Sequence, residues 1–304
     1  MKVREGRRSI EISSPEKVLF PDDGISKADI ASYYSRVATV MVPHLKGRPL
    51  TMERVPSGIE GQRFYQKEMP AYFPGWIASA ELPKAKGTVR QILCDDAATL
   101  LYLVNQNCVT PHVWLSRADR PRHPDQMMFD LDPSRDDFDH VRRTALAARD
   151  LLDRLGLPAF VKTTGSRGLH VVVPLDRSSE LDDVRDFADR TAALLAAGDP
   201  GGLTMEARKA DRGDRLFLDT WRNGYAQMAA APFAVRTRPG APVATPLTWD
   251  EVEDSKLDPA VFTASSVPAR LGERGDPWRG MMRHRRSLRG PRRTLERLEA
   301  TFPA

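Results

Sequence analysis

The stretch Met127-Met128-Phe129-Asp130-Leu131-Asp132-Pro133 places two carboxylates directly after three apolar side chains. Successive side chains of a strand point to opposite faces, so Asp130 and Asp132 share one face. Two carboxylates beside an apolar run are costly unless a cation or hydrogen-bond donors lie nearby. Such hard oxygen ligands favour Mg²⁺ or Mn²⁺. The tripeptide alone would equally suit a surface turn at the end of a strand.

A third carboxylate follows a second apolar strand, in Leu216-Phe217-Leu218-Asp219. Three aspartates, together with phosphate oxygens and water, suffice to hold two divalent ions. Two ions about 3.5–4 Å apart can clamp an in-line phosphoryl displacement. We therefore expect Asp130, Asp132 and Asp219 to converge in space, although Asp219 is far along the chain from the other two.

A polar turn, Thr163–Gly168, leads into a strand that begins Leu169-His170. Its backbone N–H groups, its hydroxyls and the guanidinium of Arg167 could bind a triphosphate. It is not a Walker A loop, because the Gly-Lys-[Ser/Thr] ending is missing. Taken alone, the segment is better interpreted as a tight hairpin with glycine at positive φ.

Hydrophobic periodicity and turn residues predict alternating helices and strands. The ranges predicted to be helical are 26–46, 95–107, 137–155 and 180–197. The ranges predicted to be extended are 50–55, 62–66, 88–93, 110–115, 127–132, 159–162, 169–174 and 215–219. Ser26 is the expected N-cap of the first helix, with Asp29 completing a capping box. Residues 236–246, rich in Pro, Gly and Ala, predict an irregular connection.

Composition sets broad limits on the class of protein. No apolar run approaches the roughly 18 residues of a membrane span, and the N-terminus lacks the apolar core of a signal peptide. We therefore expect a cytoplasmic protein. Two cysteines, Cys94 and Cys108, make neither a disulfide framework nor a zinc site and are expected to be partly buried free thiols. The net charge of +5 and the pI near 9.3 fit a polyanionic partner without proving one. The basic run 283–293 is interpreted as a solvated tail in preference to a specific nucleic-acid site.

The order of these elements, together with three motifs, resembles a known family. The motifs are Phe129–Pro133, Thr164–His170, and Ala231-Pro232 followed by Arg236–Gly240. They resemble the polymerase domain of bacterial multifunctional DNA ligase D, in the archaeo-eukaryotic primase superfamily. The resemblance runs from Pro15–Pro21 to Thr248-Trp249. No ligase-type Lys-x-Asp-Gly motif is present, so the chain resembles either the stand-alone actinobacterial relatives or an excised domain.

The resemblance implies roles for particular residues. It implies metal ligation and catalysis by Asp130, Asp132 and Asp219. It implies nucleotide binding by a larger group, namely Thr164, Ser166, Arg167, His170 and Arg236. A lysine often stands at Arg167 in relatives, and either residue supplies the charge. His112 resembles a histidine near the sugar of the incoming nucleotide, but a strand histidine satisfied by the backbone is an equally good interpretation.

The same resemblance implies DNA contacts. Lys17 and Lys27 match two basic residues that hold the 5′-phosphate of a gap or broken end. The turn Asp22-Asp23-Gly24 between them should fold the chain back and bring both ammoniums together. Phe64 and Tyr65 resemble an aromatic pair that stacks on the template strand, and Lys67 could add a phosphate contact.

One segment departs from the family pattern. Many relatives continue after the third aspartate with an Asn/Gln-Asn stretch and then Gly-Lys, whereas this chain reads Thr220-Trp221-Arg222-Asn223-Gly224-Tyr225-Ala226-Gln227. The departure puts nucleotide contacts near Arg222 and Gln227 in doubt but removes no metal ligand.

The resemblance and the motifs together predict an α/β protein. Its catalytic sheet should be primase-like, mainly antiparallel and flanked by helices, with a smaller packed N-terminal module. Residues 1–110 are expected to bind the DNA end and template, 111–260 to catalyse, and 261–304 to form a C-terminal extension.

The expected activity is template-dependent addition of nucleotides to a primer 3′-OH at gaps or double-strand-break ends with a 5′-phosphate. The resemblance implies a preference for ribonucleotides, two Mn²⁺ (or Mg²⁺) ions, and as partners a separate DNA ligase and the bacterial Ku end-binding protein. The alternatives are a de novo primase, a non-catalytic module that binds DNA ends, and a metal-dependent nuclease.

Overall fold

The two aspartates of the quoted stretch lie on β10 (Gln126–Asp132), a central strand of a six-stranded sheet with the order β13-β14-β10-β12-β11-β16. In the computed structural model, which describes residues 1–301, this sheet belongs to one of two compact units. Unit 2 comprises Arg120–Gln227, Pro246–Pro259 and the chain from Pro277 onward. Unit 1 comprises Met1–Asp119, Met228–Thr245 and Ala260–Asp276.

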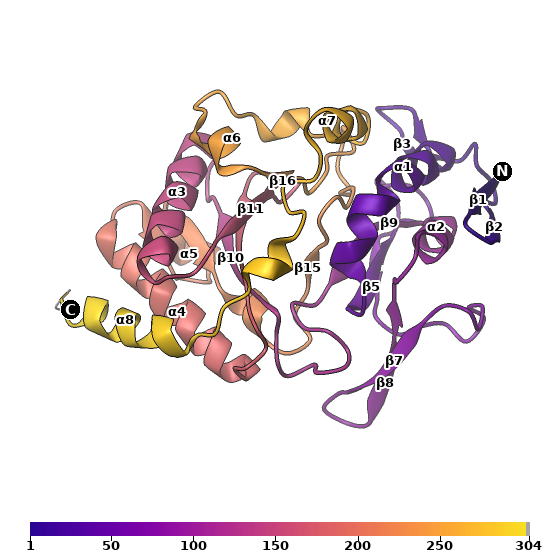
Figure 1. Ribbon diagram of the computed structural model, residues 1–304. Coiled ribbons are helices and arrows are strands. Elements are labelled where there is room, and N and C mark those ends of the chain that lie inside the picture. Colours follow the sequence, from indigo (N-terminus) through magenta and orange to yellow (C-terminus); the bar gives the residue numbers. More distant parts are fainter. Residues whose placement is uncertain (302–304) are drawn as a thin grey trace. The chain divides into compact units, whose positions relative to one another are not determined.

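Unit 2 is built around antiparallel pairs, with a single parallel pair between β13 and β14. Its other elements are α3 (Phe138–Arg154), β11 (Phe160–Thr163), β12 (Leu169–Pro174), α4 (Leu181–Gly198), β13 (Leu203–Thr204), α5 (Lys209–Arg212), β14 (Leu216–Asp219), η1 (Trp221–Asn223), β16 (Pro246–Leu247), α6 (Trp249–Glu253), η3 (Met281–His284) and α8 (Arg289–Glu299). Helices α3 and α4 both pack on β10 (Figure 1). Phe129 lines a small apolar cavity together with Ala148 of α3 and Thr191 of α4, so its side chain faces the helices. Because side chains alternate along a strand, Asp130 points to the opposite face of the sheet.

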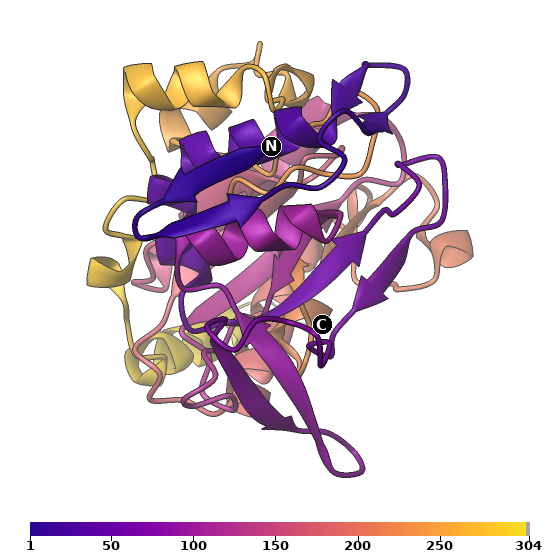
Figure 2. The same ribbon diagram turned by 90° about the vertical axis from the view of Figure 1, so that its right-hand side faces the viewer.

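Unit 1 contains a second sheet, with the order β15-β9-β5-β8-β7 and with β6 paired to β5. Its elements are β1 (Lys2–Glu5), β2 (Arg8–Glu11), β3 (Val18–Phe20), β4 (Ile25–Ser26), α1 (Lys27–Leu45), β5 (Pro49–Arg54), β6 (Phe64–Gln66), β7 (Ser79–Pro83), β8 (Thr88–Leu93), α2 (Ala97–Asn105), β9 (Cys108–Val113), β15 (Ala229–Ala230) and α7 (Val267–Arg274), with η2 (Pro259–Val261) at a unit boundary. Helices α1 and α2 pack against each other, and β7 and β8 form a long hairpin (Figure 2).

Helix α1 forms where the sequence predicted it, and for the predicted reason. The Ser26 hydroxyl accepts from the Asp29 N–H while the Asp29 carboxylate accepts from the Ser26 N–H, which completes the capping box. Ile30, Val37 and Met41 are buried along one side of the helix.

The structure adds elements that the sequence pattern did not show. Hairpin β1–β2, hairpin β3–β4 and strand β7 were not predicted, and the short strands β15 and β16 form only because late segments return to pair with β9 and β11. The basic run 283–293, interpreted from the sequence as a solvated tail, is mostly exposed, and its last five residues lie in helix α8.

Two expectations about composition can be compared with the structure. Cys94 and Cys108 are free, as predicted, and fully buried, and burial raises the pKa of each thiol. Within residues 1–301, none of the helices combines the length and the apolar character that a membrane crossing requires. The predicted assignment of end binding to residues 1–110 and catalysis to residues 111–260 stays a prediction.

Candidate active site

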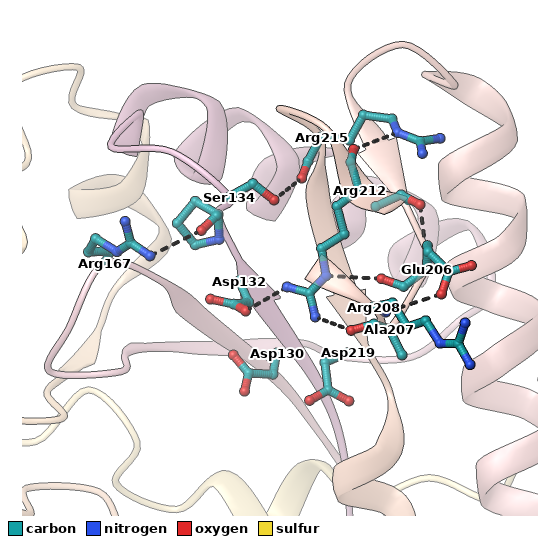
Figure 3. Close-up of polar contacts among 12 residues, drawn as sticks. Asp130, Asp132, Ser134, Arg167, Glu206, Ala207, Arg208, Arg212, Arg215 and Asp219 are labelled. Carbon is teal, nitrogen blue, oxygen red and sulfur yellow. Dashed lines mark hydrogen bonds and ion pairs between the residues drawn. The ribbon is translucent and has the colours of Figure 1, made fainter. Parts of the chain in front are cut away.

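The candidate site is a row of side chains that crosses four strands of the unit 2 sheet. Asp219 on β14 is the cross-strand partner of Asp130 on β10, Asp130 is the partner of His170 on β12, and His170 is the partner of Lys162 on β11. Cross-strand partners lie on the same face of a sheet. The three aspartates therefore approach one another opposite the helical layer, and Figure 3 shows their carboxylates close together.

Two arginines already contact these carboxylates. The Arg212 guanidinium donates to Asp132 at 3.0 Å. It also donates to the carbonyl oxygens of Glu206 and Ala207 at 3.0 and 2.8 Å (Figure 3). Arg222 Nε lies 3.6 Å from Asp130 Oδ2 and 3.9 Å from Asp219 Oδ2.

The pKa values of the aspartates reflect this crowding. Burial alone would raise the pKa of Asp130, but His170 and Arg222 outweigh it and lower the pKa to about 2. Burial raises the pKa of Asp219, and the charges of Asp130 and Asp132 raise it further. A negative charge on Asp219 is therefore unfavourable here without an additional cation.

The donor set fits a hard divalent cation, because it consists of carboxylate oxygens on one face of a rigid sheet. The side chains are not yet arranged as ligands: within residues 1–301, no three His, Cys, Asp or Glu side chains form a group that could hold a metal ion. Arg212 and Arg222 provide the positive charge instead.

His170 is the buried histidine of this row. Its Nε2 lies 3.3 Å from Asp130 Oδ1. Burial, and then the charge of Lys162, lower its pKa to about 4, so the ring is neutral at pH 7. Its buried Nδ1 has no hydrogen-bond partner among the described residues. In this arrangement the ring proton faces Asp130, so donation to a phosphate would require the hydrogen bonding of the ring to change.

The polar turn is a hairpin between β11 and β12. Thr164 N–H donates to the Gly168 carbonyl at 3.0 Å, and Gly165 has a φ of 65°. A Cβ at residue 168 would lie 2.3 Å from the Leu131 carbonyl, so the turn can approach β10 only with glycine there. Arg167 is exposed and donates to the Pro133 carbonyl at 3.4 Å. The segment is therefore a tight hairpin, as its sequence predicted, and it lies beside the end of β10.

The predicted nucleotide-binding residues divide between the units. Thr164, Ser166, Arg167 and His170 belong to unit 2, and His112 and Arg236 belong to unit 1. His112 Nε2 bonds Glu53 at 2.9 Å, so a buried carboxylate is its partner. The Thr237 hydroxyl donates to the same carboxylate at 2.6 Å. Burial alone would raise the pKa of Glu53, but these hydrogen bonds and the charges of His112 and Arg236 lower it to about 2.

The two predicted end-binding lysines lie near each other in unit 1. The Lys27 N–H donates to the Lys17 carbonyl at 2.8 Å. Lys27 Nζ lies 3.3 Å from Ser13 Oγ, and Lys17 Nζ bonds the Pro56 carbonyl. Burial, and then the charge of Lys17, lower the pKa of Lys27 to about 8. This corner therefore holds two ammoniums that repel each other.

The predicted template-binding residues lie on and after β6. Tyr65 is half-exposed, and its ring meets the His112 ring edge-on with centroids 5.4 Å apart. Phe64 is partly buried under the Arg54 guanidinium, 5.5 Å from the ring centroid, and Lys67 is exposed. Both aromatic side chains therefore retain some accessible surface.

Four residues of these sites were missed by sequence reasoning. They are Glu53, Lys162, Arg212 and Asn223. Lys162 could have been noticed as a lysine within an apolar strand. Asn223 exchanges hydrogen bonds with the backbone of Met128, two residues before Asp130, at 2.9 and 2.8 Å. It fixes η1, with Arg222, over β10. The roles of Arg212 and Asn223 could not be predicted from the local sequence, because the residues they bind are distant in the chain.

Comparisons with known proteins place this geometry in a family. A family model described as LigD, primase-polymerase domain, matches residues 26–278. The multifunctional non-homologous end joining DNA repair protein LigD of Mycobacterium tuberculosis (strain H37Rv) is 32% identical over 276 residues, which cover 88% of this chain and 36% of that protein. The bifunctional non-homologous end joining protein LigD of Bacillus subtilis (strain 168) is 31% identical over 271 residues, with 88% and 43% covered. The chain thus spans less than half the length of these relatives.

A solved structure gives the same result for the fold. The polymerase domain from Mycobacterium tuberculosis ligase D, in complex with DNA, matches with a TM-score of 0.84 and 30% identity, covering 91% of this chain and 99% of that one. The predicted α/β class with a mainly antiparallel, primase-like sheet is confirmed. The family predicted from the motifs is also confirmed: this chain belongs to the LigD primase-polymerase domain family.

Proposed function

We propose that this chain is a template-dependent nucleotidyltransferase that extends a primer 3′-OH at gaps or double-strand-break ends in nucleoid DNA. The observation that carries the proposal is the convergence of Asp130, Asp132 and Asp219 on one face of the unit 2 sheet. The relatives are named for non-homologous end joining, and the solved relative is in complex with DNA, which supports repair as the setting.

Each group of residues has a role in this proposal. The three aspartates hold two divalent ions, which when bound lower the pKa of the 3′-OH and neutralise the triphosphate. The turn Thr164–His170 orients the phosphates, with Arg167 as its charge. His112 and Arg236 are further nucleotide-binding residues in this proposal. Phe64 and Tyr65 stack on template bases, and Lys67 contacts a phosphate.

Ribonucleotides are the preferred substrates, Mn²⁺ is the better activator, and a separate DNA ligase and Ku complete the repair. Primer extension on a short gapped duplex tests this, comparing ribonucleotides with deoxyribonucleotides and Mn²⁺ with Mg²⁺. Template-directed extension is the expected result. Products on unprimed single strands would indicate a primase instead, and nucleotide release without added triphosphate would indicate a nuclease.

End selection follows from the Lys17 and Lys27 corner. Two adjacent ammoniums favour an anion between them, and a terminal 5′-phosphate carries more charge than an internal diester. Wild-type protein should bind a gap with a 5′-phosphate about tenfold more tightly than a matched gap with a 5′-hydroxyl, and less so as salt rises. The double variant Lys17→Ala, Lys27→Ala should lose this preference but still extend a simple primer-template. Equal binding of both gaps by wild-type protein at low salt would refute this role.

A further inference from the structure

The positive charge of this protein is concentrated at its C-terminal end. Residues 279–301 contain eight arginines and two glutamates, a formal net charge of +6, whereas the whole chain carries +5. The rest of the chain is therefore close to neutral overall. The family match ends at residue 278, so this segment lies outside the matched domain.

The segment is folded against unit 2. The Arg286 N–H donates to the Pro174 carbonyl at 3.1 Å, and the Asp176 N–H donates to the Arg286 carbonyl at 3.1 Å. Helix α8 then packs along α4, beside which it lies in Figure 1. The segment is thus a built surface with a defined inner and outer side.

The inner side of α8 holds the helix in place. Leu288 and Leu295 are buried. Arg292 pairs with Asp183 at 3.1 Å, and Glu299 pairs with Arg190 at 2.5 Å, both across to α4. Positions 288, 292, 295 and 299 recur at helical spacing, so they form one face.

The outer side of α8 is a stripe of arginines. Arg289, Arg293 and Arg297 are exposed and four residues apart, which places them about 6 Å apart along one face of the helix. Further exposed arginines precede the helix, namely Arg283, Arg285 and Arg286. Glu296 is the one exposed carboxylate between Arg289 and Arg297.

The arginines of α3 and α4 show what is unusual here. Arg143 pairs with Asp139, Arg149 pairs with Asp150 and Glu253, and Arg185 pairs with Asp189. Within residues 1–301, by contrast, no carboxylate lies within ion-pair distance of the six exposed arginines of the C-terminal segment. A solvated helix face ordinarily carries charges of both signs in similar number, whereas the outer side of α8 carries three exposed arginines and one exposed glutamate.

We propose that the exposed arginines of residues 283–297, here called the arginine face, bind the phosphate backbone of duplex DNA without regard to sequence. Duplex DNA carries one negative charge per roughly 1.7 Å of its axis. A rigid row of guanidiniums can neutralise several of its phosphates at once, each with two parallel hydrogen bonds. The arginine face needs no DNA end, so it supplies affinity for intact duplex in addition to the end contacts of the proposed function.

Closed circular duplex DNA, which has no ends, tests this proposal. The variant Arg289→Gln, Arg293→Gln, Arg297→Gln removes the stripe, and glutamine keeps a similar helix propensity. The matched control is Arg143→Gln, Arg149→Gln, Arg185→Gln, which removes the same charge from paired arginines of the same unit. Circular dichroism and thermal unfolding verify that both variants fold. Binding is measured at several salt concentrations.

The stripe variant should bind the circle at least about tenfold more weakly at low salt. The slope of log K against log salt should fall by about 2–3, since each lost phosphate contact removes about 0.9. The control should keep the wild-type slope. Equal slopes for stripe variant and wild type would overturn the proposal. Binding of the stripe variant to poly-glutamate and to anionic vesicles is measured as well. If the variant loses binding to either of these but not to DNA, the proposal is also overturned, because the arginine face would then bind an acidic protein or a membrane.

Primer extension at saturating DNA separates this proposal from the proposed function. The stripe variant should extend a short primer-template as fast as wild-type protein. Absence of extension by wild-type protein would refute the polymerase proposal and leave the arginine face untouched, whereas an unchanged slope refutes only the arginine face.

Discussion

Each unit of this protein buries a carboxylate against a histidine, and the two pairs differ in what surrounds them. In unit 2, Asp130 lies 3.3 Å from His170, and in unit 1, Glu53 lies 2.9 Å from His112. The pKa of each carboxyl group is lowered to about 2. Both carboxylates are therefore charged at neutral pH and lie beside a buried histidine.

The neighbours of the two pairs are different. Glu53 receives a second hydrogen bond from Thr237 and has the Arg63 guanidinium 3.6 Å away. Asp130 likewise has an arginine at 3.6 Å, Arg222, but it also has two further carboxylates beside it. Burial and the charges of Asp130 and Asp132 raise the pKa of Asp219. Glu53 is thus a single carboxylate among donors, whereas Asp130 belongs to a group of three carboxylates that depends on Arg212 and Arg222 for positive charge.

A histidine–carboxylate pair alone therefore does not mark a catalytic centre. A group of several like charges marks it better, because a folded protein keeps such charges together only at a cost in stability. On this argument the Asp130 pair is the better candidate for the chemistry, and the Glu53 pair stabilises unit 1. Four variants test the distinction.

The largest effect is expected from Asp130→Asn. Loss of one of three ligands should lower the rate of nucleotide incorporation at least about a thousandfold. The melting temperature should fall by a few degrees only, because the lowered pKa of Asp130 means that the folded chain favours the charged carboxylate, which asparagine cannot replace. Single-turnover extension and calorimetry measure the two quantities. Activity above a tenth of wild type would show that the ion site lies elsewhere.

Glu53→Gln should act mainly on stability. A neutral amide cannot replace the charged partner of His112 and Thr237, so the free energy of unfolding should fall by about 3 kcal/mol. The pKa of Glu53 is lower in the folded chain than its ordinary value near 4.5. The difference between wild type and variant should therefore be complete above that value and shrink as pH falls toward 2.

Urea unfolding of both proteins across this pH range measures the difference. A constant difference at every pH would mean that the carboxylate charge contributes nothing. A loss of extension as large as that of Asp130→Asn, in a variant that remains folded, would erase the distinction between the two pairs.

His170→Asn should lower kcat/KM for the nucleotide by about ten- to thirtyfold, which is the range of one lost polar contact. DNA affinity should remain that of wild type, since the residue lies in the row of carboxylates and not on the predicted DNA surfaces. Steady-state kinetics and a binding titration separate the two effects. Unchanged nucleotide kinetics would leave the hairpin as a purely structural feature.

The smallest effect is expected from Arg212→Gln. The Arg212 guanidinium forms an ion pair with Asp132 at 3.0 Å, so removal of the guanidinium should free this carboxylate for a metal ion. Mn²⁺ should bind about three- to fivefold more tightly in the absence of nucleotide, as measured by calorimetric titration. Weaker Mn²⁺ binding would show that Arg212 supports the site and does not compete for it.

Local sequence determined much of this protein. Alternation along residues 127–132 places Asp130 and Asp132 on one face, and the residues Ser26 and Asp29 set the start of α1, because both effects act within a few residues. The motifs also sufficed for the family. The paired position of Asp219 was expected from a repeated pattern of apolar strand and aspartate, and the strand register places it opposite Asp130.

Tertiary structure alone decided what compensates these charges. The partners of Asp132, Asp130 and Glu53 are Arg212, His170 and His112, which lie 80, 40 and 59 residues away in the chain. The arginine face likewise exists only because Leu288 and Leu295 are buried against unit 2 and so turn Arg289 and Arg293 outward. Periodicity reports which face of an element is apolar, but the partner of a charge depends on strand order and register, which are set by long-range packing.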